Sequence, residues 1–175
     1  MAKSDSFFIR HTQNIGGSTA TGTGTYFESA IDLGAYVNAL GKSVLRIHNI
    51  AVSLTDSAGT SVELEGTYSA AAQFQLVTQP QSDTVLPSNK AVIASGTVNA
   101  RRVDSGDGLA SQVYEAFDNL PQLWTNGYLV AVDTIYLGGE ASLRWYGDVY
   151  VSVTMECTVE TMNTAAAMAL ALSQQ

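Results

Sequence analysis

One stretch of this 175-residue sequence constrains its fold more than any other, the segment LRWYGDVYVSVTMECTV from Leu143 to Val159. Every second residue, starting with Leu143, is apolar or glycine, and each residue between them carries a charge or a hydroxyl group. Because side chains alternate between the two faces of a strand, the pattern predicts one long strand with a buried face and a solvent-facing one. At roughly 3.3 Å per residue, this strand would span about 50 Å. Such a strand needs antiparallel neighbours and a second apolar layer.

Shorter segments elsewhere show the same strand character. They are Phe27–Leu33, Ser43–Leu54, the surroundings of Val62 and Leu64, the surroundings of Phe74 and Leu76, Ala91–Ala100 and Tyr128–Leu137. Turn and loop residues separate them, as in Asp56–Gly59. Gly138 and Gly139 predict a hairpin-type turn before the long final strand. About eight antiparallel strands of uneven length favour an all-β fold, a two-sheet antiparallel sandwich of jelly-roll type.

Three positions admit more than one interpretation. The apolar phase changes at His48, which predicts a β-bulge or a bend between sheets. Asp133 lies on the apolar face of Tyr128–Leu137, so either the register slips there or the carboxylate is buried with a partner. The apolar spacing in Gln112–Leu123 is compatible with a short helix, and a strand is the alternative.

The two ends of the chain differ in composition from the middle. We expect a flexible N-terminal arm at residues 1–24, a β-sandwich domain at 25–161 and a C-terminal tail at 162–175. The arm is rich in glycine and threonine, which bury too little surface to repay ordering. The tail, MNTAAAMALALSQQ, is rich in helix formers, and Asn163 or Thr164 is suited to cap a helix. Because so short a helix is unstable alone, it must pack on its own domain, a neighbouring subunit or a lipid surface.

Charge is scarce and mostly negative. Only 14% of the residues are charged, against about 25% in typical soluble proteins. Such a surface suits a protein whose faces are covered by neighbours, although an ordinary neutral β-protein would have the same composition. The formal net charge is −8, and Arg144 is the one basic residue among nine carboxylates from Asp104 onward. A sheet with this balance repels phosphate, so we expect no direct nucleic-acid binding.

The sequence contains no recognisable motif for catalysis or for a cofactor. It has no P-loop, no GxGxxG after a strand, no GxSxG and no CxxC. His11 and His48 have no zinc-ligand spacing. Cys157 is the single cysteine, and it falls on the apolar face of the final strand, which predicts a core residue. We therefore predict no enzyme activity and no catalytic, cofactor-binding or metal-binding residue.

Two segments have an alternative interpretation as binding sites. The residues DSGDG of Asp104–Gly108 have the look of a small calcium loop, but aspartate and glycine are also ordinary turn residues. An aromatic strip on the polar face of the final strand is typical of a sugar-binding or protein-binding surface, and tyrosine also suits half-buried sheet faces without any ligand. The strip consists of Arg144, Tyr146, Asp148 and Tyr150.

The N-terminal residues MAKSDSFFIRH lack the apolar core of a signal peptide, and no segment has the length of a membrane span. We therefore expect synthesis in the cytosol without secretion by the signal-peptide route.

The segment Asn126–Glu160 is predicted to contain the penultimate strand, a short turn and the long last strand. The whole chain then consists of an N-terminal arm, about eight strands and an apolar tail. In this organisation the chain resembles the single-jelly-roll capsid proteins of tailless icosahedral viruses, above all the membrane-containing viruses of archaea and bacteria. The resemblance implies a self-assembling structural subunit of a virion, without catalysis. It further implies a homo-oligomer, with a second capsid protein or an internal membrane, contacted through the tail, as further partners.

Two alternatives stay open, because jelly rolls host unrelated functions. The first is a lectin-like, carbohydrate-binding sandwich that uses Tyr146 and Tyr150, or Asp104–Gly108 with calcium. The second is a phage head-decoration protein, a tail accessory protein or a filament subunit. Glycan or calcium binding by a stable monomer would favour the lectin, and concentration-dependent assembly would favour the structural functions.

Overall fold

The computed structural model describes residues 4–18, 25–38, 40, 42–104 and 109–175. Within these ranges the chain forms nine β-strands, a 3-10 helix at Pro121–Leu123 and one α-helix. The elements are β1 (Phe7–Asn14), β2 (Phe27–Asp32), β3 (Ser43–Thr55), β4 (Ser69–Val77), β5 (Val92–Asp104), β6 (Leu109–Asn119), β7 (Tyr128–Val130), β8 (Thr134–Ala141), β9 (Tyr150–Thr161) and α1 (Thr164–Ser173).

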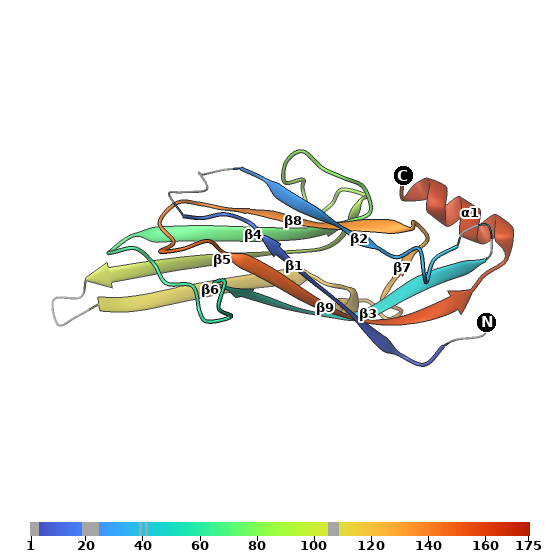
Figure 1. Cartoon of the computed structure of the whole chain (residues 1–175), viewed down its shortest axis with the longest axis horizontal. Coiled ribbons are helices and arrows are strands. Elements are labelled where there is room, and N and C mark those ends of the chain that lie inside the picture. The colour runs from blue at the N-terminus through green and yellow to red at the C-terminus, as the bar shows by residue number, and fades with distance from the viewer. Residues whose placement is uncertain (1–3, 19–24, 39, 41, 105–108) are drawn as a thin grey trace.

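The strands build two antiparallel sheets (Figure 1). The smaller sheet has the order β1-β9-β3-β7 and the larger one the order β2-β8-β4-β5-β6. The pairing is concentric: β1 pairs with β9, β2 with β8, β3 with β7 and β4 with β5. This is the strand order of a jelly roll, in which one long hairpin is rolled into two sheets. The predicted fold class is confirmed, with β6 added at the edge of the larger sheet.

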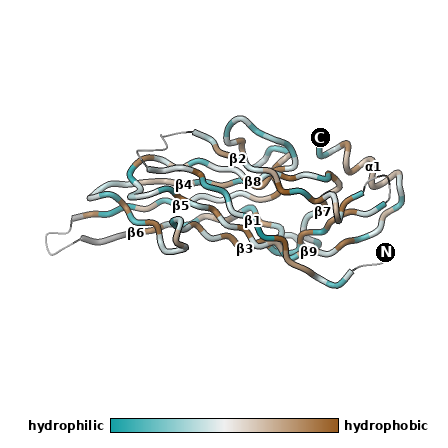
Figure 2. Tube along the Cα trace, in the orientation of Figure 1, coloured by the Kyte–Doolittle hydropathy of each residue, from teal (hydrophilic) through white to brown (hydrophobic). Residues whose placement is uncertain are grey.

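The core lies between the inner faces of the two sheets. Val151, Val153 and Met155 of β9 are buried on one side, and Phe74 and Leu76 of β4 are buried on the other. Figure 2 shows hydrophobic and hydrophilic positions interleaved along the strands of both sheets. The alternation read from the sequence is therefore the burial pattern of a sandwich.

The long final strand begins later than predicted. β9 starts at Tyr150, and most of the segment 143–149 connects the two sheets instead of extending the strand. Trp145 is buried there and donates its indole N–H to the carbonyl of Ala71 at 3.2 Å. Arg144 has a φ of 93°, which a strand does not allow. The apolar alternation of this segment reflects the packing of Trp145 in the core and not a strand.

The predicted strand Tyr128–Leu137 is two strands in different sheets. β7 belongs to the smaller sheet and β8 to the larger one, and residues 131–133 carry the chain between them. Asp133 lies at this crossing with an exposed side chain, and its carbonyl accepts the backbone N–H of Leu33 at 2.7 Å. Of the two interpretations of Asp133, the break in register is correct and the buried carboxylate is wrong.

Gly138 and Gly139 lie inside β8 and do not form the predicted hairpin turn. A Cβ on Gly138 would collide with the hydroxyl of Tyr26, and one on Gly139 would collide with the carbonyl oxygen of Gln73. The two glycines therefore allow close approach of neighbouring groups, which is the other reason for glycine within a strand.

Two further ambiguities are settled by strand pairing. The register between β3 and β9 shifts between Ile47 and Asn49, so the bulge predicted at His48 is confirmed. The segment Gln112–Leu123 belongs mostly to β6, so the helical interpretation is wrong for all but its last residues. Phe117 of β6 packs edge-on against Phe74 at 5.7 Å between ring centroids, which places the apolar residues of this segment on a strand.

Part of the predicted N-terminal arm is a paired strand. Phe7–Asn14, inside the predicted arm, is β1 and pairs with β9 along its whole length, so flexibility is wrong for these residues. Residues 19–24 lie outside the described part of the chain. The division into an arm, a domain and a tail stays a prediction.

The predicted tail helix is present as α1. Asn163 is its N-cap, and its side-chain oxygen accepts the backbone N–H of Ala166 at 2.8 Å. Of the packing alternatives, the tail lies on its own domain, where Ala167 is buried against Val44 and Ala131. No helix in the described residues is long and apolar enough to cross a membrane.

Candidate assembly surfaces and binding grooves

The outer face of the smaller sheet is polar but nearly free of exposed charge. Antiparallel register places the even-numbered residues of β1 and β9 on this face, together with Asn49, Ala51, Ser53 and Thr55 of β3. The hydroxyl and amide side chains on this face are Thr12, Asn14, Asn49, Ser53, Thr55, Tyr150, Ser152, Thr154 and Thr158. Side chains of this kind exchange water for protein partners at a lower cost than charged side chains do.

The charges on this face are few. Arg10 is exposed and lies 5.5 Å from the ring of Phe8, over which it forms a cation–π contact. The carboxylate of Glu156 accepts a hydrogen bond from the side-chain amide of Asn49. Arg46 and Glu160 form an ion pair of 2.7 Å, in which the Glu160 side chain is fully buried and the Arg46 side chain is 12% exposed. Arg46 and Glu160 therefore neutralise each other, whereas Arg10 and Glu156 contact uncharged side chains.

Helix α1 covers one end of the same face. It buries Ala167 on Val44, and Val44 lies directly across from Glu160 in the β3–β9 ladder. The helix itself carries no charged residue. On its outer side Met168 is 42% exposed and Leu172 is 68% exposed. An uncharged helix with apolar residues on its outer side suits a surface that is covered in an assembly.

The last two residues of the chain attach the tail to the body. The carbonyl of Gln174 accepts the hydroxyl of Thr78 at 2.9 Å and the amide of Gln79 at 3.1 Å. The side chain of Gln174 is buried and bonds to the backbone of Leu129 in β7 and of Ala131 just after it. The ammonium group of Lys90 donates to the backbone carbonyl of Gln175 at 2.8 Å. The position of the tail is therefore specified by polar contacts as well as by apolar packing.

The predicted aromatic strip does not lie on one strand face. Arg144 stacks on Tyr68 with its guanidinium 4.2 Å from the ring centroid, and its ion pair with Glu65 is long, at 3.8 Å. Asp148 accepts a hydrogen bond from Asn14 at 2.9 Å, and the hydroxyl of Tyr150 also bonds to Asn14, at 3.2 Å. These contacts hold the connection between β8 and β9.

Three members of the strip nevertheless meet at a pocket of about 520 Å³ between two loops. The residues around it are Asp56, Ser57, Thr60, Ser61, Val62, Glu63, Tyr146, Gly147, Asp148 and Tyr150. Tyr146 is 79% exposed. Hydrogen bonds from Thr60 and from nearby backbone groups hold the pKa of Asp56 below its usual value. The pocket offers hydroxyl groups, carboxylates and aromatic faces, the groups that bind sugar hydroxyls and rings.

The histidines and the cysteine have structural positions. His11 bonds through Nε2 to the hydroxyl of Ser29 at 2.7 Å and so joins β1 to β2, and burial lowers its pKa. His48 bonds through Nε2 to the hydroxyl of Thr158 at 2.9 Å. Cys157 is buried, as predicted, and desolvation raises the pKa of its thiol to about 12. A thiol of this kind is unreactive at neutral pH.

The predicted calcium loop Asp104–Gly108 lies mostly outside the described residues, since residues 105–108 are not part of them. Within the described residues, no group of three or more histidine, cysteine or carboxylate side chains is arranged to hold a metal ion. The calcium interpretation stays a prediction.

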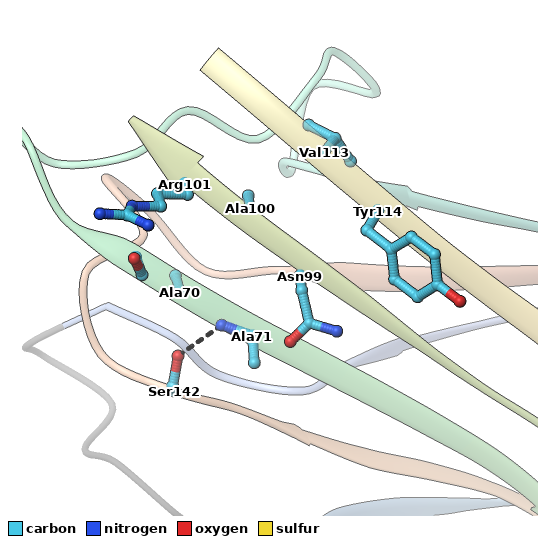
Figure 3. Close-up of a pocket in the computed structure, with 9 residues that line it drawn as sticks. Ala70, Ala71, Asn99, Ala100, Arg101, Val113, Tyr114 and Ser142 are labelled. Carbon is cyan, nitrogen blue, oxygen red and sulfur yellow. Dashed lines mark hydrogen bonds between the residues drawn. The ribbon is translucent and has the colours of Figure 1, made fainter. Parts of the chain in front are cut away.

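A groove that the sequence did not indicate runs over the outer face of the larger sheet (Figure 3). It has a volume of about 570 Å³. Asn99 and Arg101 of β5 and Tyr114 of β6 lie along it, and Ser142 accepts the backbone N–H of Ala71 at 2.7 Å. The register that brings Asn99 opposite Tyr114 is a tertiary property, so only the pairing of β5 with β6 reveals this surface.

Comparison with known proteins finds similarity only among solved structures. No protein-family model and no curated protein matches the sequence. VP1 of Trichodysplasia spinulosa-associated polyomavirus, in complex with sialylated glycooligomers, aligns with 10% identity and a TM-score of 0.43 over 89% of this chain and 95% of that one. The unassembled VP1 pentamer of Merkel cell polyomavirus aligns with 9% identity and a TM-score of 0.41 over 92% and 98%. At these values the fold assignment rests on the strand order, and function has to be argued from the surfaces.

Proposed function

We propose that this protein is a structural, self-assembling subunit of a virion, forming a shell through protein–protein contacts and without catalysis. The observation that carries the proposal is the outer face of the smaller sheet, a broad surface of hydroxyl and amide side chains with few free charges. Charged side chains are depleted where a protein buries its surface against another. Only 14% of the residues are charged, and one sheet face is almost uncharged. Such a face is suited to being buried against other copies of the protein.

Two further features support assembly. Helix α1 presents Met168 and Leu172 outward, although a solvent-facing helix normally carries charge there. The jelly roll is a fold that builds shells in viruses, so the architecture is compatible with this use, though it also hosts other functions. A second shell protein, contact of the tail with an internal membrane and the absence of nucleic-acid binding belong to the same proposal.

Matched serine variants test the sheet face. Ser53 lies on the outer face of β3, and Ser57 lies four residues later in an exposed loop. Light scattering and sedimentation velocity across concentration would measure the mass of the full-length protein, of Ser53→Glu and of Ser57→Glu. We expect oligomers for the unmodified chain and for Ser57→Glu, and loss of assembly for Ser53→Glu. A monomer at every concentration would overturn the proposal for the purified chain.

A second candidate function, saccharide binding, is favoured by one observation. Tyr146 is 79% exposed beside the pocket that contains Thr60, Asp148 and Tyr150, and a free aromatic face next to hydrogen-bonding groups is the usual arrangement for a sugar ring. Titration with glucose, galactose and N-acetylglucosamine, followed by amide NMR shifts, would test it. Binding should be lost in Tyr146→Ala and kept in Tyr114→Ala, an exposed tyrosine on another surface.

A further inference from the structure

The groove on the outer face of the larger sheet extends beyond the part that Figure 3 shows. Three hollows of about 570, 470 and 550 Å³ follow one another along β4 and β5. The first and second share Asn99, and the second and third share Thr97. They therefore form one continuous groove. Along β5 the groove extends from Arg101 to Ser95, which is about 20 Å at roughly 3.3 Å per residue.

A small side chain deepens the groove at its centre. The strand register places Ser142, Ala71, Asn99 and Tyr114 in one row across the outer face (Figure 3). Ala71 is exposed and carries only a methyl group, whereas Asn99 and Tyr114 beside it are larger. The floor of the groove therefore lies on β4, and the side chains of β5 and β6 form one of its walls.

The groove offers side-chain polar groups and not backbone ones. β4 lies between β8 and β5, and β5 lies between β4 and β6, so the ladders use the backbone N–H and C=O groups of both strands. A peptide therefore cannot bind here as an added strand. The amide of Asn99 and the guanidinium of Arg101 are exposed to solvent, and the hydroxyl of Thr97 lines the middle of the groove. These groups suit a ligand that carries many hydroxyl groups.

An exposed aromatic ring lies toward each end of the groove. Tyr114 is 66% exposed and lies across from Asn99. Trp124 is 57% exposed, follows the 3-10 helix and lines the opposite end together with Ser95 and Asn119. Rings of this kind combine a large apolar face with a polar group at the edge, which suits stacking on sugar rings.

The charges that line the groove balance each other. Arg101 lies at one end, and Glu140 of β8 lies on one side, where its carboxylate accepts a hydrogen bond from the amide of Gln73. The other described residues that line the three hollows are uncharged. A groove with one cation and one carboxylate favours a neutral ligand over a phosphate, a sulfate or a polycation.

We propose that this groove binds a neutral, extended oligosaccharide, a β-linked chain of several sugar rings. Its hydroxyl groups bond to the amide and hydroxyl side chains, and its ring faces stack on Tyr114 and Trp124. The lining residues that the structure describes here all differ from those around the pocket at Tyr146, so this is a separate site. It does not depend on self-assembly, and it lies on the opposite side of the sandwich from the outer face of the smaller sheet.

Tryptophan fluorescence of the full-length protein gives the direct test. The chain has two tryptophans, of which Trp145 is 6% exposed and Trp124 is 57% exposed, so acrylamide quenches mainly Trp124. We expect cellotetraose to protect Trp124 from acrylamide. Maltotetraose, whose α-linked chain curls, should protect it much less. Glucose should not protect it at the same concentration, because one ring fills only part of the groove.

Two variants with matched controls locate the bound sugar by calorimetry. Ala71→Leu fills the floor, and since Ser142 bonds only to the backbone of Ala71, the fold should be kept while cellotetraose binding is lost. Its control is Ala30→Leu, an exposed alanine on the same outer face but on β2.

The second variant removes the indole ring. Trp124→Ala should weaken cellotetraose binding by about tenfold, because the stacking contact is lost. Its control is Leu123→Ala, the neighbouring residue, which is 56% exposed. Circular dichroism would confirm that all four variants are folded.

The outcomes separate this site from the functions proposed above. Cellotetraose binding that is lost in Ala71→Leu and kept in Ala30→Leu supports the groove. No binding of cellotetraose to the unmodified chain overturns it, and equal binding of maltotetraose overturns the extended shape of the ligand. Binding that is lost in Tyr146→Ala but unchanged in Ala71→Leu places the sugar at the loop pocket and also overturns the groove. None of these results bears on self-assembly, which light scattering measures.

Discussion

The side chain of Gln174 bonds to the backbone at the end of β7: Oε1 accepts the backbone N–H of Ala131, the residue after the strand, at 2.9 Å, and Nε2 donates to the carbonyl of Leu129 at 2.6 Å. β7 is the end strand of the smaller sheet, so these two groups have no strand partner of their own. The tail therefore closes one sheet edge, whereas β6 leaves the opposite sheet with an open one.

Removing this side chain should destabilise the protein. Gln174→Ala leaves the buried backbone N–H of Ala131 and the partly buried C=O of Leu129 without these partners, so we expect a loss of about 1–3 kcal/mol in the free energy of unfolding. Urea denaturation measures it, and hydrogen exchange at residues 129–131 should accelerate. Gln175→Ala is the control, because only its backbone carbonyl is used. Equal stability of the two variants would show that Gln174 does not hold the edge.

The buried ion pair gives a second prediction. Glu160→Ala leaves Arg46 without its carboxylate beneath the tail, and we expect a loss of about 3–5 kcal/mol. Replacing both residues by leucine should recover most of that loss, because the uncompensated charge is removed. For comparison, Glu65→Ala breaks an exposed pair and should cost less than about 1 kcal/mol. A small effect of Glu160→Ala would contradict the buried pairing.

Gly139 should not tolerate a side chain. The Cβ of Gly139→Ala would collide with the backbone carbonyl of Gln73 in the adjacent strand, which cannot move aside without disturbing the ladder. We expect a loss of about 1–3 kcal/mol in thermal or urea unfolding. Gly147→Ala, where the new Cβ would meet nothing within 4 Å, serves as the control and should be close to neutral.

The thiol of Cys157 makes stability fall at high pH. Its pKa is raised from 9.0 to about 12 in the folded protein, so above pH 9 the unfolded state binds fewer protons than the folded state. The contribution of the protonated, buried thiol to the free energy of unfolding is complete below pH 9 and is lost as the pH rises toward about 12. We would compare the unfolding free energies of the unmodified chain and of Cys157→Ala over this pH range. Burial also raises the pKa of Tyr128, but this affects both proteins equally, so their difference isolates the effect of the thiol. Parallel pH profiles would contradict it.

The parts predicted from the sequence are those that depend on local burial and local bonding. Alternation identified β9 from Tyr150 onward, and the change of phase identified the bulge at His48. The apolar face of β9 predicted the buried Cys157, and a side-chain oxygen ahead of a helix-forming run predicted the cap Asn163. Each of these signals lies within a few residues of the feature that it predicts.

The errors share one cause. The segment 143–149 alternates because Trp145 is buried, although it is not a strand, and Gly138 and Gly139 resemble a turn although they lie at a crowded position within β8. Alternation reports which side chains are buried and not which backbone they pair with. For the same reason β6 could not be distinguished from a helix before its pairing with β5 was known.

The sequence by itself determined that this chain forms a β-sandwich with a buried thiol, a capped tail helix and few charges, because periodicity, capping and composition act over short stretches. Only the tertiary structure decided that Tyr128–Leu137 is shared between two sheets, that Gln174 closes the edge of β7 and that Tyr114 stands at the open edge of β6. Those positions depend on hydrogen bonds between residues far apart in the sequence, and such pairing is selected by the packing of the whole sandwich.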